Sequence, residues 1–307
     1  MALIARHVRR MGMADSWVAD FRDDASVPFR WQRPWLRRYL QHVRADADAI
    51  TAVSQGFLDI MGFSDIGRVV ANGYDPEDVR ALPDAPQRGG ALSFAYCGQL
   101  YAGHSDLTPF LEALADVLRE RNEPLTRVAL HYAGTQGAAF AAQAAASGLQ
   151  TAVLDHGMLP REGSLQLQRN ADALLAATWN TPERRGVITG KILEYMMADR
   201  PVFLCVSGEI PGSEARALVE GTRLGVACEP QTRADDLARM KRYLHQLFDA
   251  RFSGAASPYH PDREQIEGFQ YSGIARQMAL VLETAFENAA SRSGRHEPGR
   301  SATAGNR

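Results

Sequence analysis

Cysteine is scarce in this sequence, and long apolar runs are absent. The 307 residues include three cysteines, Cys97, Cys205 and Cys228, which are odd in number and far apart. Two of them sit in apolar runs, so we expect buried, reduced thiols in a cytosolic protein and no disulfide framework. No apolar run approaches the roughly 20 residues that span a bilayer. The first residues also lack the apolar core and cleavage site of a signal peptide.

An excess of charge of one sign is missing too. Lys and Arg number 34 and Asp and Glu number 36, which gives a net charge of −2. This balance gives no reason to expect a nucleic-acid partner. We find no convincing cluster of metal ligands, so no metal site is predicted. The 45% apolar and 23% charged residues are those of a globular protein, and the length permits one large or two ordinary domains.

A regular alternation of apolar runs and helical segments occupies residues 91–252. It predicts one complete doubly wound α/β domain, in which six parallel strands are joined by five crossovers. The expected strands are Leu92–Cys97, Val128–Ala133, Thr151–Leu154, Ala173–Ala176, Val202–Val206 and Gly225–Cys228.

A shorter pattern of the same kind occupies residues 1–80. It offers only three strands, near Ser16–Phe21, Ala49–Ser54 and Arg68–Asn72, so we expect a partial Rossmann-like domain. The strand Trp17–Phe21 would form an uncovered sheet edge, which proteins normally avoid. Either the first strands of this domain are missing from the chain, which we favour, or something else covers the edge.

Three further segments are assigned by composition. Residues 81–90, rich in Pro and Gly, are the expected linker between the two domains. Residues 253–290 are expected to form a C-terminal helical segment. The tail 291–307, rich in Ser, Arg and Gly, is expected to be disordered.

The stretch from Thr189 to Pro201 carries the most chemical information. Thr189 can cap a helix, and Pro201 lies beyond its end. Lys191 and Glu194 are three residues apart and share one face of the first turn. A cation and free N–H groups at a helix start suit a phosphate, and a carboxylate one turn on can accept hydrogen bonds from sugar hydroxyls. The pair indicates a nucleotide-sugar site; its alternative is an ordinary solvated ion pair.

Several segments together resemble glycosyltransferase family 4. Ala47–Ser54 is similar to the family's segment that leads into the last acceptor-domain strands, and Val70–Asp75 is similar to its "pNGyD" turn. Tyr96–Tyr101 resembles the first strand and loop of the donor domain, and Ala171–Leu175 resembles the fourth strand of that domain. Lys191–Tyr195 with Arg200–Val202 is similar to the "KlfEYlaagkPvl" motif. The resemblance implies a GT-B fold of two facing Rossmann-like domains, each a parallel sheet flanked by helices, with the first domain incomplete at its N-terminal side.

The resemblance also implies an activity. Members of the family transfer a sugar from a nucleotide-sugar to an acceptor hydroxyl, typically with retention of configuration and without a catalytic metal. We therefore expect a hexosyltransferase-type enzyme that uses no cofactor, since the nucleotide-sugar is its substrate.

Donor-binding roles follow position by position. Glu194 matches the second glutamate of the family's pair, which typically holds the ribose. Gly186 stands where the first glutamate would be, so that contact is absent or supplied differently. Lys191 matches a lysine near the donor phosphates, and Gly98 and Tyr101 match the loop that approaches the diphosphate.

Further candidates lie in other loops. His156, Gly157 and Met158 match the loop whose backbone faces the nucleotide base. Arg161 can reach a phosphate or be a surface arginine, and His104 is a minor candidate.

The end of the early strand supplies the candidate catalytic residues, Asp20, Arg22 and Asp23. They fall where the family's acceptor domain presents polar groups to the cleft, and the carboxyl ends of parallel strands are placed for function. The alternative is a loop-capping aspartate with an arginine partner.

Residues 30–44 contain five arginines and no acid, and Trp31, Trp35, Tyr39 and Val43 recur every four residues. Such a helix can lie on an anionic membrane surface and would suit a lipid-linked acceptor. The alternative is an ordinary crossover helix with its aromatic side buried. The expected location is the cytoplasm, or the inner membrane face if this helix binds lipid.

Three functional hypotheses remain. The first is a glycosyltransferase of cell-surface polysaccharide or glycolipid synthesis. The second is a non-catalytic nucleotide-sugar-binding remnant or subunit that needs a partner chain. The third is a nucleotide-sugar epimerase, which shares the two-domain architecture but fits the motif between Lys191 and Pro201 less well.

Overall fold

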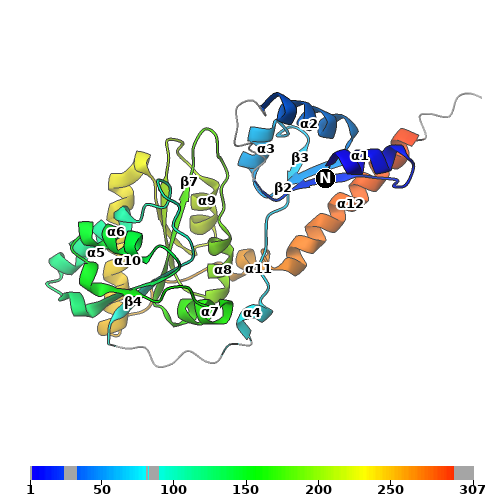
Figure 1. The fold of residues 1–307 in the computed structure, drawn as a ribbon. Helices are drawn as coiled ribbons and strands as arrows, with labels where there is room; N and C mark the ends of the chain where they lie inside the picture. The colour runs from blue at the N-terminus through cyan, green and yellow to red at the C-terminus, as the bar shows by residue number, and fades with distance from the viewer. Residues whose placement is uncertain (1, 24–32, 81, 83–89, 294–307) are drawn as a thin grey trace, which may run out of the picture.

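The structure is a computed structural model that describes residues 2–23, 33–80, 82 and 90–293 (Figure 1). Residues 30–32 of the basic segment, most of the expected linker and the tail from residue 294 lie outside these ranges. The described chain builds two separate parallel sheets, one of three strands and one of six. We refer to each sheet with its helices as the small domain and the large domain.

The large sheet has the strand order of a doubly wound fold, β6-β5-β4-β7-β8-β9. All neighbouring strands are parallel, and the order reverses between β4 and β7. All six expected strands are present: β4 (Leu92–Cys97), β5 (Val128–Ala133), β6 (Val153–Asp155), β7 (Ala173–Trp179), β8 (Val202–Ser207) and β9 (Gly225–Cys228).

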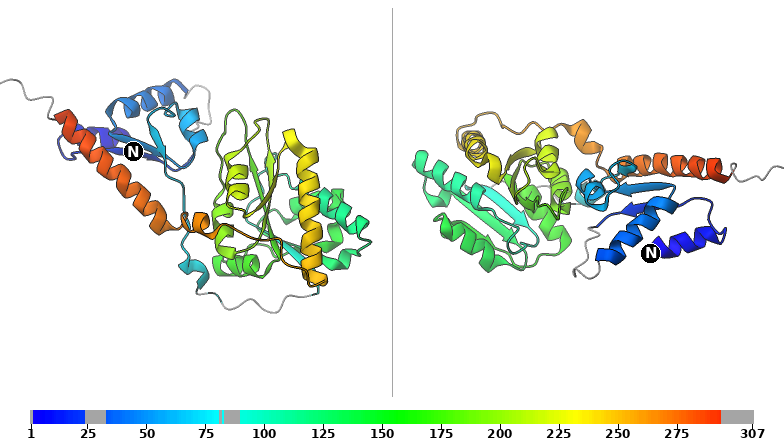
Figure 2. Two further views of the ribbon diagram at one scale, coloured as in Figure 1. Left: turned by 180° about the vertical axis from the view of Figure 1, so that it is seen from behind. Right: turned by 90° about the horizontal axis from the view of Figure 1, so that it is seen from above.

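Helices bury both faces of this sheet (Figure 2). Alternate residues of β7 join opposite cores: Leu175 packs with one set of helices and Leu174 with the other. The first set is α5 (Thr108–Glu120), α6 (Gly137–Ala146) and α10 (Arg233–Phe252), and the second includes α8 (Gly190–Ala198) and α9 (Glu214–Gly221), with α7 (Arg161–Asn170) beside α8. A sheet covered on both faces explains why its strands are continuously apolar in sequence.

The small sheet has the order β1-β2-β3, so β1 is an edge strand in the described part of the chain. The helix α12 returns from the far end of the sequence to pack on β1 and β2, where Ile274 and Val281 are buried with Val70. In Figure 2, α12 lies on one side of this sheet and α1 and α2 on the other. The elements are α1 (Ala2–Arg10), β1 (Val18–Phe21), α2 (Arg33–Asp46), β2 (Ala49–Ala52), α3 (Gln55–Met61), β3 (Gly67–Val69) and α12 (Tyr271–Ser293).

Two segments connect the domains. One runs from Val70 into α4 (Glu77–Arg80), and the other contains α11 (Arg263–Glu267). They meet where Tyr74 pairs with Gln270, and the Tyr74 hydroxyl donates to the Ile266 carbonyl at 3.2 Å. Within the described residues, no helix combines the length and apolarity needed to cross a membrane.

Some element limits differ from those expected. The strand β7 continues to Trp179, beyond the expected Ala176. The helix α9 begins at Glu214, because the Ser213 side chain caps it by accepting from Arg216 N. Thr189 does occupy the N-cap position of α8, but its side chain makes no capping hydrogen bond.

Phe203 tests the packing of the large core. It is fully buried, with its ring centroid 5.0 Å from that of Phe110 and 5.6 Å from that of Tyr243. We expect Phe203→Ala to lower the free energy of unfolding by about 3–5 kcal/mol, because the packed aromatic leaves a cavity. Chemical denaturation measures the change. Phe286→Ala is the control, since this side chain on α12 is 59% exposed; equal losses in both variants would contradict the assignment of the core.

Candidate functional site

The carboxyl end of β4 and the start of α8 come together in the large domain. Lys191 Nζ donates to the Gln99 carbonyl at 3.2 Å and lies 5.0 Å from the centroid of the Tyr96 ring. Gly98 has φ 117°, and a Cβ there would lie 2.7 Å from Lys191 Cε. A side chain at position 98 would therefore push the Lys191 side chain out of this position, and glycine does not. Burial lowers the pKa of Lys191, and the nearby Glu194 carboxylate opposes that shift.

Glu194 is held by side chains of the neighbouring helix α7. Its carboxylate accepts a hydrogen bond from Gln168 Nε2 and lies 3.8 Å from an Arg161 guanidinium nitrogen. Arg161 also pairs with Asp78, which belongs to α4 in the first connecting segment. Lys191, Glu194 and Arg161 thus form one charged cluster, which brings together three residues singled out from the sequence.

The start of α8 has a buried polar atom without a partner. Thr189 Oγ1 is inaccessible and makes no hydrogen bond. The first N–H groups of a helix have no partner one full turn before them. At this start Ile192 N donates to the Thr189 carbonyl at 3.0 Å, and the Thr189 side chain caps no N–H group. Beside the lysine, these groups can bind an anion.

The loop after β6 pairs two histidines. His131 Nδ1 and His156 Nε2 are 2.9 Å apart, and the rings stack with centroids 5.2 Å apart. Gly157 follows with φ 61°, and its N–H donates to Asp155 Oδ1 at 2.9 Å. Met158 is exposed. A hydrogen bond between two imidazoles requires at least one of them to be neutral.

An aromatic group lies at the carboxyl end of β7. The ring centroid of Trp179 is 5.4 Å from that of Tyr101 and 4.9 Å from that of His104. Trp179 is 8% exposed and its indole N–H has no partner, whereas Tyr101 is 43% exposed. Trp179 was not among the residues expected at the site, because the strand was expected to end at Ala176. The signal for it was an aromatic residue two positions after the apolar run that ends at Ala177.

On the small domain, Asp20 and Arg22 bind each other. Arg22 Nε donates to Asp20 Oδ2 at 2.6 Å, and the other carboxylate oxygen accepts from Thr51 Oγ1 at 2.6 Å. Arg22 also donates to the Val70 and Ala71 carbonyls at 3.1 and 3.0 Å, so it ties the ends of β1 and β3 together. Asp23 is exposed. This arrangement matches the alternative of an aspartate with an arginine partner, and a catalytic role for the three residues stays a prediction.

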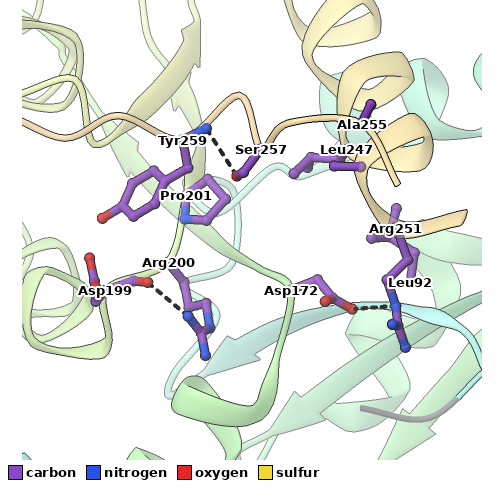
Figure 3. A pocket seen from close by; sticks show the side chains of 11 residues that line it. Leu92, Asp172, Asp199, Arg200, Pro201, Leu247, Arg251, Ala255, Ser257 and Tyr259 are labelled. Carbon is purple, nitrogen blue, oxygen red and sulfur yellow. Dashed lines mark hydrogen bonds and ion pairs between the residues drawn. The ribbon is translucent and has the colours of Figure 1, made fainter. Parts of the chain in front are cut away.

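A separate cavity of about 250 Å³ lies at the other end of the large sheet (Figure 3). Leu92 begins β4, while Asp172 and Pro201 directly precede β7 and β8, so the cavity is at the amino ends of these strands. Ligands of such sheets bind at the carboxyl ends. We therefore place the candidate site at Lys191 and Glu194. Among the residues that the structure describes, no three His, Cys, Asp or Glu side chains form a group that could hold a metal ion.

Comparison with known proteins supports the fold. No protein-family model matches the sequence, and no curated protein matches it. Solved structures do match. HepE of Anabaena, in complex with UDP and glucose, has a TM-score of 0.61 at 16% identity, over 92% of this chain and 75% of that one. A glycosyltransferase from Rickettsia africae ESF-5 has a TM-score of 0.57 at 13% identity, over 92% of this chain and 80% of that one.

A sucrose-phosphate synthase from Thermosynechococcus elongatus also matches, with a TM-score of 0.54 at 17% identity, over 89% of this chain and 68% of that one. These structural neighbours are GT-B glycosyltransferases. The expected α/β fold of GT-B type, with two parallel sheets flanked by helices, is confirmed.

The histidine pair predicts a pH dependence of stability. Burial, with a smaller contribution from His156, lowers the pKa of His131 from its ordinary 6.5. Below about pH 6.5, the unfolded chain therefore binds a proton that the folded chain does not. Stability is fully present above that pH and is lost as the pH falls towards the folded pKa.

We expect the melting temperature of the wild type to fall between about pH 7 and pH 5 more steeply than that of His131→Gln. Thermal unfolding followed by circular dichroism over this range measures the slopes. His260→Gln, at an exposed histidine, is the matched control. Parallel curves for the wild type and His131→Gln would refute a contribution from the pair.

Proposed function

We propose that this chain is a glycosyltransferase of the family 4 type. It binds a nucleotide-sugar at the carboxyl edge of the large sheet and transfers the sugar to an acceptor hydroxyl. The observation that carries the proposal is the packing of Lys191 against Gly98 at the start of α8, with Glu194 one turn further on. The GT-B fold and its likeness to HepE, a structure with UDP and glucose, support it.

The cluster has the chemistry of a nucleotide diphosphate site. Lys191 is partly buried, and burial disfavours its charged form. The negative charge of a bound diphosphate would stabilise the charged form again. The N–H groups at the start of α8 add donors for the same anion. The Glu194 carboxylate has lone pairs beyond those used by Gln168 and Arg161, and these can accept from ribose hydroxyls.

Transfer breaks the bond between the sugar anomeric carbon and the diphosphate oxygen and forms one to the acceptor oxygen, whose proton passes to the departing diphosphate. The departing diphosphate gains negative charge. Lys191 and the helix N–H groups are fixed in advance to stabilise that charge, and such electrostatic preorganisation is usually the largest catalytic contribution. We assign the acceptor side to Asp20, Arg22 and Asp23, and retention without a catalytic metal follows from the family resemblance.

A second candidate is nucleotide-sugar binding without transfer, by a subunit that works with a partner chain. Two observations favour it. Gly186 offers no carboxylate where the family's first glutamate stands, and the Asp20 carboxylate is occupied by Arg22 and Thr51. Binding of a nucleotide-sugar that is neither hydrolysed nor transferred would favour this candidate, whereas inversion at a sugar carbon would favour an epimerase.

Calorimetric titration with nucleoside diphosphates and their sugars tests the donor site. We expect one nucleotide to bind, and Glu194→Ala to weaken it by about 1–3 kcal/mol, because a buried hydroxyl contact is lost. Lys191→Ala should weaken the diphosphate strongly and the bare nucleoside little. Glu162→Gln, at an exposed acid in the first turn of α7, is the control. Unchanged affinity in Glu194→Ala, or equal losses in Lys191→Ala for both ligands, would remove those residues from the site.

The process we propose is synthesis of cell-surface polysaccharide or glycolipid, with a saccharide or lipid-linked acceptor, in the cytoplasm. The helix α2 is the segment that would meet the inner membrane face. Trp35 is 73% exposed, with Arg37 and Arg38 exposed beside it. Val43, at the other end of the stripe, is buried in the small core, and Arg44 pairs with Asp65. The first half of α2 is therefore available to a membrane, and the second half packs one apolar face on the small sheet, as an ordinary crossover helix does.

Vesicle co-sedimentation tests this contact. We expect the chain to bind vesicles with about 30% anionic lipid, and Trp35→Ser to weaken that binding several-fold, because the exposed indole is the apolar anchor. Phe286→Ser is the control, since it removes an exposed aromatic from α12, on the other side of the small sheet. Equal binding by all three proteins, or no binding by the wild type, would leave α2 as a crossover helix alone.

A further inference from the structure

A carboxylate of the large domain binds the small domain through two backbone N–H groups. Glu214, the first residue of α9, accepts from Gln55 N at 2.9 Å and from Gly56 N at 2.6 Å. These N–H groups begin α3, which lies on the side of the small domain that faces the large one (Figure 1). A helix start attracts negative charge, and a carboxylate is its natural counterpart. The contact joins residues far apart in the chain and lies away from the two connecting segments.

Two glycines let the domains meet at this point. A Cβ on Gly56 would lie 2.5 Å from the Arg185 carbonyl carbon and 2.5 Å from Gly186 N. A Cβ on Gly186 would lie 2.6 Å from Glu214 Oε1 and would overlap Ser54 Oγ. Gly186 also has φ 69°, which favours glycine. The place of a side chain at position 186 is therefore taken by Ser54, Gly56 and the Glu214 carboxylate.

The start of α9 holds Glu214 firmly. Glu229 is buried and accepts from Gly212 N and Ser213 N, each at 2.8 Å. Asp236 in turn accepts from Glu229 N at 3.0 Å and pairs with Arg216. The residue before Glu214 is thus fixed by a buried network, so the carboxylate is presented to α3 from a rigid base.

The large domain also places a positive charge near α3. Asp59, one turn into α3, has a lowered pKa because Ser64 and Gln55 donate hydrogen bonds to it, and the positive charge of Arg185 adds to the effect. Arg185 precedes Gly186 in the large domain and lies against the start of the same helix, since a Cβ on Gly56 would be 2.8 Å from the Arg185 Cβ. The large domain thus places one negative and one positive side chain beside α3.

We propose that Glu214, Gly186 and the start of α3 form a latch that holds the small domain closed over the carboxyl edge of the large sheet. When the domains separate, the hydrogen bonds between the Glu214 carboxylate and the two N–H groups must break, and water must replace each partner. A side chain at position 186 would keep the latch from closing. Glu214 acts here as a positioning residue, and the latch goes beyond the proposed transfer because it depends on no substrate.

The distance between the domains measures the latch directly. Spin labels on Gln41→Cys in α2 and Ala145→Cys in α6 sit at exposed positions, one in each domain. The native cysteines are buried, so they compete little for the label. Double electron–electron resonance on the full chain then gives the distribution of distances. The wild type should give one dominant distance.

Two variants open the latch by different means. Glu214→Gln removes the charge, and we expect the ratio of open to closed molecules to rise about tenfold, equivalent to ~1.4 kcal/mol. Gly186→Ala should also raise the ratio of open to closed molecules, because its methyl group displaces Ser54 and Glu214. Glu162→Gln is the matched control: it also neutralises an acid in the first turn of a helix of the large domain.

The outcomes separate the proposal from its rivals. Broader or longer distances in both variants, with the control unchanged, support the latch. An unchanged distribution in either variant that remains folded by circular dichroism overturns it. Nucleotide affinity measured on the same samples distinguishes failure of the latch from failure of the donor site, since the latch predicts a shift in distance even without a ligand. If Glu214→Gln does not fold, the distance distribution of Gly186→Ala alone supports or overturns the latch.

Discussion

Burial of both faces of an all-parallel sheet is the constraint on which the rest of the structure depends. The two cores that meet on β7 leave the strands no polar face, so chemistry is confined to the strand ends. Parallel connection then places every carboxyl end on one edge. Gly98, Trp179 and the start of α8 gather there, although they are distant in sequence.

The architecture followed from the sequence because it depends on periodicity and breakers. The apolar runs predicted all six large strands, and Pro201 marked the boundary between α8 and β8. The ends of elements were harder to predict where side-chain chemistry decides them. Ser213 fixes the start of α9 as its cap, and β7 continues to Trp179. Three short strands also indicated the small sheet, but α12 as its cover was not visible, because its apolar positions do not say which sheet they meet.

The candidate site was predictable in part. Lys191, Glu194 and Gly98 were identified from the helix start and the family resemblance, and the carboxyl-edge rule explains why they meet. Their partners were not identifiable. The contact of Gln168 with Glu194, the pair of His131 with His156, and the reach of Glu214 to Gln55 depend on side-chain positions set by tertiary packing. Gly186 was read as a missing carboxylate, and the structure shows a position with no room for one.

The return of α12 to the small sheet has a consequence for biosynthesis. Strands β1 to β3 are made before the large domain, but Val70 and its neighbours gain their apolar cover only when Ile274 and Val281 have been made. The large domain lies wholly between these segments in sequence and needs neither of them for its core. Domains usually fold in the order of synthesis. In this chain the whole of the large domain is therefore made before the small sheet can be covered by α12.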